Sequence, residues 1–441
     1  MNRLNNFARR SLLALSTAAA ANCFAIGGAH AQDTVQAKEV AHSKSSSAAE
    51  TKTGAKSKNA DTSHLEKPRI EVCFVLDTTG SMSGLIQGAK DKIWLIANEL
   101  LESETTPEIQ FSLIGYRDRG DQYVTKITKM TDDIDEVYTD LTAFVADGGN
   151  DKPESVNQAL NEALTQIEWS VDDSVLKIVF LVGDAPPHMD YDDDVLYSSV
   201  CKVAKQKGVI INTIQCGADP ETTAIWEEIA QIADGEFSAI EQSGGTQQIQ
   251  TPYDAELARY NISLNRTVCG YGDSWVQKSV KQKILSNQGS KAESIADRAS
   301  FFSTLRNAPA SPSCNQAVGG QQDLVEMLMD GKIELTDVKN DLLPEDLKDL
   351  EIEERNAKLT ERIAERKKVL ERIDELVAQR TAFLKENRSK VAAKPDSFDV
   401  RVRSVVQAQA AAKGIKYSVS NDSDTSIEPT KPPVSTPASD K

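Results

Sequence analysis

Apolar runs alternate with amphipathic stretches over residues 68–243. Short, nearly continuous apolar segments predict strands, which include Ile70–Leu76, Ile109–Tyr116, Val175–Val182 and Val209–Gln215. Between these segments, apolar residues recur at helical spacing, for example from Leu85 to Leu100. Strands that are buried on both faces and joined by helices are typical of a mostly parallel sheet. The pattern therefore predicts a doubly wound α/β domain with helices on both faces of the sheet.

The two ends of the chain have a different character. Residues 1–31 have a basic start, an apolar stretch and the sequence Ala29-His30-Ala31, which together are typical of a signal peptide with its cleavage site. Residues 32–67 predict a disordered tether and residues 420–441 a disordered tail, because both are polar and lack an apolar period. We therefore expect an exported protein, periplasmic or secreted. The pair Arg9-Arg10 leaves twin-arginine export open beside the general secretory route.

The second half of the chain is mainly helical. We expect a mixed helical and irregular linker over residues 244–320, a long charged helical region over 321–392, and a short helical or strand segment over 393–419. Two sets of positions recur every seven residues: Asn356, Ile363, Leu370, Val377 and Leu384, and also Ile352, Leu359, Arg366, Ile373 and Arg380. This spacing is typical of a coiled coil, although Asn and Arg interrupt the apolar seam. A hairpin that packs on itself and a coiled coil that joins copies in a homo-oligomer through residues 350–390 stay alternatives.

Composition narrows the classes of function. The 441 residues have a formal net charge of −17, which argues against binding to nucleic acid or to anionic membranes. No run after the signal reaches the roughly 18 apolar residues that a membrane span needs. The cysteines show no C-x-x-C spacing, so they predict no zinc site. Whether Cys269 and Cys314 pair in an oxidising compartment stays open.

Oxygen-bearing residues gather where three predicted strands or turns end. The segments are Asp77-Thr78-Thr79-Gly80-Ser81, Gly148-Gly149-Asn150-Asp151-Lys152-Pro153-Glu154 and Gly183-Asp184-Ala185-Pro186-Pro187-His188. A doubly wound sheet brings the carboxyl ends of its strands to one edge. Carboxylates that meet there repel one another unless a cation binds between them. We therefore predict a cation site made by Asp77, Thr79, Ser81 and Asp184, with Asp151 or Asn150 beside it.

The spacing D-x-T-x-S resembles the metal-ion-dependent adhesion site (MIDAS) of von Willebrand factor A (VWA) domains. With the G-G-N-D-x-P-E loop and Asp184, the resemblance extends over roughly residues 67–243 and is to a bacterial exported type. It implies a Rossmann-type fold in which the two hydroxyls bind the metal directly and Asp77 acts through water. The family often has Gly-Gly-Thr in the second loop, where this chain has Asn150 and then Asp151. An added carboxylate there lowers the residual positive charge of the metal.

The resemblance also implies a function. VWA domains bind protein partners, often through an acidic group that completes the coordination of Mg²⁺, Mn²⁺ or Ca²⁺. On this hypothesis the chain is an adhesion or interaction protein and not an enzyme. A scaffold protein that acts through its coiled coil, with the metal only stabilising the fold, is the main alternative.

Other interpretations of the same residues have less support. Gly80-Ser81-Met82-Ser83-Gly84 resembles a hydrolase nucleophile elbow, but Met82 occupies the position of the nucleophile. A serine hydrolase on Ser81 or Ser83 also lacks a well-placed histidine, because His188 follows Asp184 by only four residues and acid and base would come from one short loop. We expect His188 on a surface loop, with an approach to the metal site as the alternative. A phosphotransferase on Asp77 and a plain helix cap are further alternatives. We expect Arg119-Gly120-Asp121 to form an ordinary turn. We expect the acidic run 190–194 to supply negative charge to the start of the next helix.

Overall fold

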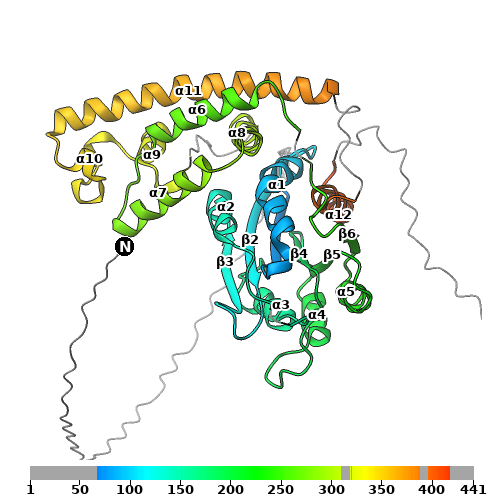
Figure 1. Cartoon of the computed structure of the whole chain (residues 1–441). Helices are drawn as coiled ribbons and strands as arrows, with labels where there is room; N and C mark the ends of the chain where they lie inside the picture. Colours follow the sequence, from blue (N-terminus) through cyan, green and yellow to red (C-terminus); the bar gives the residue numbers. More distant parts are fainter. Residues whose placement is uncertain are drawn as a thin grey trace, which may run out of the picture. The chain divides into compact units, whose positions relative to one another are not determined.

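One sheet of six strands organises the first part of the chain (Figure 1). The computed structural model describes residues 67–149, 151–247, 249–308, 318, 320–387 and 396–417. The strand order is β3-β2-β1-β4-β5-β6, and only the β2–β3 pair is antiparallel. The strands are β1 Arg69–Asp77, β2 Glu108–Tyr116, β3 Thr125–Thr131, β4 Leu176–Gly183, β5 Val209–Cys216 and β6 Phe237–Ile240. This arrangement confirms the predicted doubly wound, mostly parallel α/β sheet.

Two apolar layers cover the sheet. One layer packs helices α1, α2 and α12 on the face that carries Phe74, and the other packs α3, α4 and α5 on the face that carries Val75. Alternate residues of a strand point to opposite faces, which is why neighbours in β1 enter different layers. The helices are α1 Ser83–Leu101, α2 Ile134–Ala143, α3 Val156–Thr165, α4 Tyr197–Gln206, α5 Pro220–Ile232 and α12 Phe398–Ala412.

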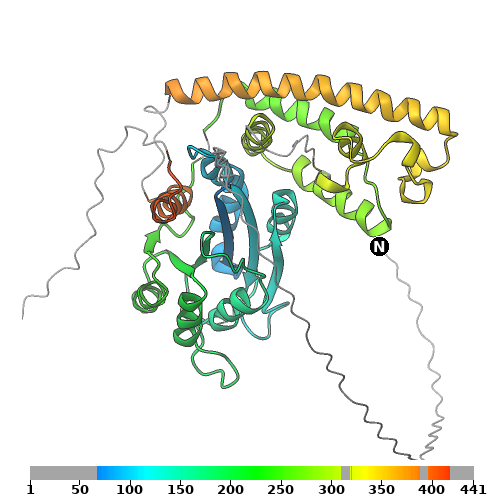
Figure 2. The same ribbon diagram turned by 180° about the vertical axis from the view of Figure 1, so that it is seen from behind.

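Helix α12 comes from far along the sequence, yet it packs against α1 and β4 (Figures 1 and 2). Its Phe398 lies 6.3 Å from the Phe74 ring of β1, and the backbone N–H of Phe398 donates to the carbonyl of Gly244 at 2.9 Å. Arg403 forms a 2.6 Å ion pair with Glu99 of α1. Apolar residues at positions 398, 402, 405 and 406 form one helical face, which explains why the helix enters the core. The short segment expected over 393–419 thus completes one layer of the sheet.

The remaining helices form a region between β6 and α12. The long helix α11 packs against α6, α8 and α9. Leu370, Ile373 and Val377 of α11 share an apolar cluster with residues of α6 and α8. The helices are α6 Asp254–Thr267, α7 Ser274–Gln288, α8 Ala292–Asn307, α9 Leu324–Met329, α10 Glu345–Lys348 and α11 Ile352–Asn387. No helix in the described ranges is long and apolar enough to cross a membrane.

The arginines that interrupt the heptad pattern have partners within this chain. Arg380 of α11 donates to Asp254 of α6 and to Asp297 of α8, each at 2.8 Å. Arg366 donates to the hydroxyl of Thr267 at 2.8 Å. Buried charges need such partners, so these contacts hold one side of α11 against the chain's own helices. Homo-oligomer formation through residues 350–390 stays a prediction.

Several sequence predictions lie outside the described residues. These are the signal peptide, most of the tether, the disordered tail, Asn150 and Cys314. Cys73 of β1 and Cys216 of β5 are buried.

Candidate metal site

Asp77 ends strand β1 as a fully buried carboxylate. Its Oδ1 accepts hydrogen bonds from the backbone N–H and the hydroxyl of Thr79, at 2.8 and 2.6 Å. Its Oδ2 is buried, and no hydrogen-bond partner for it is found in the described part of the chain. Burial raises the pKa of Asp77 to about 7, although the Thr79 hydrogen bonds lower it. A buried carboxylate oxygen without a donor fits a bound cation.

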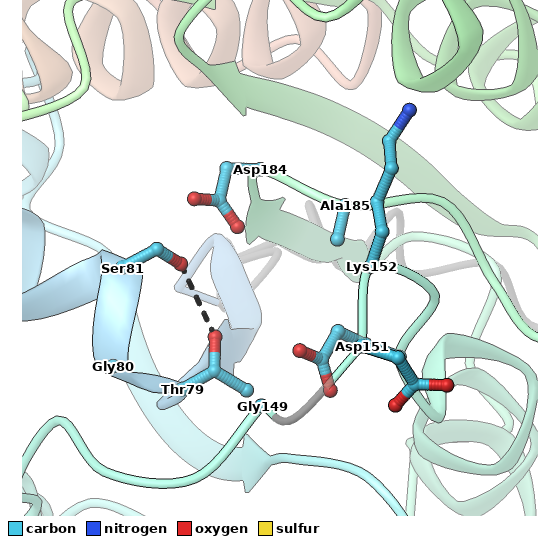
Figure 3. A pocket seen from close by; sticks show the side chains of 9 residues that line it. Thr79, Gly80, Ser81, Gly149, Asp151, Lys152, Asp184 and Ala185 are labelled. Atoms are coloured by element: carbon cyan, nitrogen blue, oxygen red, sulfur yellow. Dashed lines mark hydrogen bonds between the residues drawn. The ribbon is translucent and has the colours of Figure 1, made fainter.

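Asp77 does not cap a helix. The residues at the N-caps of the first short turn and of α1 are Thr79 and Met82, and neither cap has a side-chain hydrogen bond. The Asp77 side chain instead holds Thr79, whose hydroxyl lies 3.4 Å from that of Ser81. Figure 3 shows these two hydroxyls pointing toward each other across the turn. Local geometry therefore presents the two hydroxyl oxygens together.

Asp184 follows β4, the neighbour of β1 in the sheet. The register pairs Leu76 with Val182, so Asp77 and Asp184 lie near equivalent ends of parallel strands. One oxygen of Asp184 accepts from the Nε2 of Gln242 at 2.6 Å. Figure 3 shows Asp184 across from Ser81. Both residues line a cavity of about 240 Å³. We call Asp77, Thr79, Ser81 and Asp184 the Asp77 site.

The second loop adds a carboxyl group that the sequence analysis did not place in the site. Glu154 lines the cavity and is 3% exposed, and its Oε2 has no hydrogen-bond partner among the described residues. Burial, and then the charge of Asp77, raise the pKa of Glu154 to about 9. Without a cation in the cavity, this raised pKa keeps Glu154 protonated at neutral pH. Its signal in the sequence is the last residue of the G-G-N-D-x-P-E loop.

Gly149 allows this loop to approach closely. Its φ is +74°, and a Cβ atom there would lie 2.9 Å from the Oε1 of Glu154 and 3.0 Å from the Cβ of Thr79. Gly80 also donates its backbone N–H to the carbonyl of Gly148 at 3.3 Å. The glycines therefore join the first and second loops at the cavity wall.

Asp151 and Lys152 lie on the outer part of the same wall. The side chain of Asp151 is 61% exposed, and its Oδ2 lies 3.7 Å from the Nε2 of His188. Lys152 points away from the hydroxyls (Figure 3) and donates to Asp219 and Glu221 at 2.8 and 3.0 Å. Asp151 thus lines the cavity, and its carboxylate contacts His188.

His188 differs from its expected setting, while Arg119 and Gly120 of the RGD tripeptide lie in the expected turn. The expectation of a surface loop for His188 is wrong, because its side chain is 8% exposed and stacks on Tyr191. Arg119 pairs with Asp193 and Asp194 at 2.7 Å each, so part of the acidic run binds this arginine. Asp121 accepts from the backbone N–H of Gly149 at 3.1 Å. The tripeptide therefore stabilises the loops internally.

The oxygen donors of the Asp77 site fit a divalent cation. Two carboxylates and two hydroxyls are hard ligands, and one buried carboxylate oxygen has no other partner among the described residues. The model of the von Willebrand factor A domain family matches residues 71–253. This part of the chain is a VWA domain.

Comparison with curated proteins adds a distant relative. A putative ariadne-like RING finger protein of Acanthamoeba polyphaga mimivirus is 28% identical over 120 residues. The match covers 27% of this chain and 11% of that protein, so the chain spans only a small part of the relative.

Solved structures that match part of this chain share little sequence with it. Proximal thread matrix protein 1 from the mussel byssus is 14% identical, with a TM-score of 0.31, and the match covers 40% of this chain and 42% of that one. The SpRpn10 VWA domain is 13% identical, with a TM-score of 0.31 and coverage of 40% and 89%. An aerotolerance-related membrane protein of Bacteroides fragilis is 16% identical, with a TM-score of 0.28 and coverage of 40% and 92%.

Proposed function

We propose that this chain is an exported protein whose VWA domain binds a protein partner through a divalent cation at the Asp77 site. Thr79 and Ser81 would bind the cation through their hydroxyls, and Asp77 and Asp184 would supply the negative charge. Mg²⁺ is the preferred ion, with Mn²⁺ and Ca²⁺ as alternatives, because all the donors are hard oxygens. The cation would bind a carboxylate of the partner directly, as one of its oxygen ligands.

The buried Oδ2 of Asp77 carries this proposal. Removing a carboxylate oxygen from water without a donor is unfavourable, and here the pKa of the group rises to about 7 as a result. A divalent cation would remove this cost and would also reduce the repulsion between Asp77 and Asp184.

The described contacts favour binding over catalysis. His188 is the one histidine in the described part of the chain, and no hydrogen bond joins it to Ser81 or Ser83 there. A serine nucleophile would need such a base. We therefore propose a non-enzymatic role.

The contacts of α11 favour the metal site over the coiled coil as the binding surface. Apolar residues of α11 and the side chains of Arg366 and Arg380 are engaged with α6, α8 and the segment before α9. A scaffold that acts through this stripe would first have to separate these helices. We propose instead that the helical region supports the VWA domain.

Metal titration with a matched pair of variants tests the function. Ser81→Ala removes a proposed ligand, and Ser83→Ala removes an exposed hydroxyl two residues away. Calorimetry of the full chain should show saturable Mg²⁺ or Mn²⁺ binding in the wild type and in Ser83→Ala, and binding at least about tenfold weaker in Ser81→Ala. Capture of a partner from the extracytoplasmic fraction should follow the same order and should be abolished by EDTA. Equal metal affinity in all three proteins would refute the site.

A further inference from the structure

A second group of ligand atoms lies beside the Asp77 site and is made by other residues. The Nε2 of His188 lies 3.4 Å from the Oδ2 of Asp118 and 3.7 Å from the Oδ2 of Asp151. One ligand atom from each of the three residues lies within 4.8 Å of the other two. We call Asp118, Asp151 and His188 the His188 site. They come from the loop after β2, the second loop, and the loop after β4.

The Nε2 atom of His188 is aimed into this group and has no hydrogen-bond partner among the described residues. The residue is 7% exposed, and its Nε2 is fully buried with no hydrogen bond among the described residues. The other ring nitrogen, Nδ1, lies 2.8 Å from the Oδ1 of Asp190. A proton on Nδ1 would donate to this carboxylate and leave the lone pair of Nε2 directed at Asp118 and Asp151. Metal-binding histidines are commonly oriented by a carboxylate in this way.

Asp118 is also held in place by its neighbours. The hydroxyl of Ser155 donates to its Oδ1 at 2.9 Å, and the hydroxyl of Tyr191 donates to its Oδ1 and Oδ2 at 3.1 and 2.9 Å. The Tyr191 ring stacks on the His188 ring at 4.2 Å, and Arg119 lies 4.1 Å above the Tyr191 ring centre. Two of the three ligand side chains are therefore fixed before any ion binds. The third, Asp151, is exposed and leaves the site open to solvent.

We propose that Asp118, Asp151 and His188 bind a second divalent cation of the transition-metal class, with Zn²⁺ as the preferred ion. Ligand atoms on a tetrahedral zinc ion with bonds of about 2.0–2.1 Å stand about 3.3 Å apart, close to the observed 3.4 and 3.7 Å. An imidazole nitrogen selects such metals over Mg²⁺ and Ca²⁺, which take oxygen ligands. Water or a ligand would take the fourth position. Asp151 thus belongs to the His188 site rather than to the Asp77 site.

A Co²⁺ titration of the full chain tests this site, because Co²⁺ bound by imidazole is followed by its visible absorption. Excess Mg²⁺ fills the Asp77 site first, and Zn²⁺ then competes for the bound Co²⁺. We expect one Co²⁺ to bind the wild type and Zn²⁺ to displace it. His188→Asn and Asp151→Asn should each weaken Co²⁺ binding at least about tenfold.

Two controls separate this site from its neighbour and from general charge effects. Asp192→Asn removes an exposed charge from the same loop as His188, and should keep the wild-type Co²⁺ affinity. Ser81→Ala should also keep it, since Ser81 is outside the His188 site. If His188→Asn fails to fold, Asp151→Asn still tests the site, because the exposed Asp151 side chain can be changed without disturbing the core. An imidazolium that satisfies the carboxylates without metal would give no Co²⁺ binding in the wild type, and this result would overturn the proposal. So would a Co²⁺ signal that depends on Ser81 and not on His188.

Discussion

Replacing Asp77 by asparagine should stabilise the metal-free protein and remove its response to Mg²⁺. The asparagine side chain keeps an Oδ1 acceptor for the two Thr79 hydrogen bonds. Its Nδ2 takes the place of an oxygen that has no hydrogen-bond partner among the described residues, so the number of unpaired buried atoms stays the same. The change therefore removes mainly a buried charge.

The magnitude follows from the pKa of Asp77. Burial raises this pKa from 3.8 to about 7, which is about 3 units and, at about 1.4 kcal/mol per unit, at most about 4 kcal/mol. The folded metal-free protein binds this proton more tightly than the unfolded chain does. Its free energy of unfolding thus falls as the pH rises from about 4 to about 7, and the whole cost is present above that window. The asparagine of the variant does not titrate, so Asp77→Asn should equal the wild type near pH 4 and exceed it by up to about 4 kcal/mol at pH 8.

Mg²⁺ should remove the difference between the two proteins. A cation present at a thousandfold its dissociation constant stabilises the wild type by about 4.1 kcal/mol, while the variant should gain much less. Urea unfolding at pH 4 and pH 8, with EDTA or Mg²⁺, measures both effects. The fluorescence of Trp94 and Trp226 reports on the VWA domain, because both are fully buried in it.

Glu154→Gln is the matched control. It also replaces a buried carboxyl group of the cavity, whose pKa is raised from 4.5 to about 9 in the folded protein. At pH 8 the folded protein keeps this proton while the unfolded chain has lost it, so Glu154→Gln should also be more stable than the wild type in EDTA. Unlike Asp77→Asn, it should keep the stabilisation by Mg²⁺, because Glu154 is outside the Asp77 site. An Asp77→Asn protein that is less stable than the wild type in EDTA at pH 8 would refute the reasoning, because the unpaired oxygen would then impose no cost.

Three further changes test the framework of the fold. Phe398→Ala should lower the free energy of unfolding of the VWA domain by about 3–5 kcal/mol in urea unfolding, because the ring is buried against β1; a surface-like effect would mean that α12 is not part of the core. Arg380→Ala should cost about 3–5 kcal/mol by leaving Asp254 and Asp297 without their shared cation, and sedimentation should show whether the oligomeric state changes with it. Gly149→Ala should weaken Mg²⁺ binding in calorimetry and lower the melting temperature, since φ is +74° and the new Cβ would meet Glu154; wild-type values for both would contradict the close approach of the two loops.

Local patterns in the sequence predicted the sheet and the first loop of the site. The apolar run that ends at Asp77 predicts a strand, and Thr79 and Ser81 follow it within one turn. Asp184 follows a second apolar strand in the same way. Since parallel strands end at one edge, two local patterns are enough to bring these oxygens to one cavity.

The other features of the site depend on burial and on contacts between residues far apart in the sequence. A local sequence pattern does not predict such contacts. Gln242 contacts Asp184 across 58 positions of the sequence, and the residue has no pattern that marks it. His188 follows a strand like a loop residue, but Tyr191 covers one face of its ring and Asp118 and Asp190 engage its two nitrogens. Its burial depends on three loops that meet only in the folded chain.

For the long helix α11, too, the sequence pattern predicts burial but not the residues that α11 contacts. A heptad repeat predicts that one side of α11 is buried, but it does not predict which helix packs on that side. Arg366 and Arg380 interrupt the apolar seam, and a parallel, in-register pair of α11 helices would place like charges at the same level. In the fold the side chain of Arg380 meets two aspartates from different helices, and that of Arg366 meets Thr267 and Asp323. The irregular positions of the repeat therefore match the chain's own acidic residues, and they favour packing within one chain over pairing between copies.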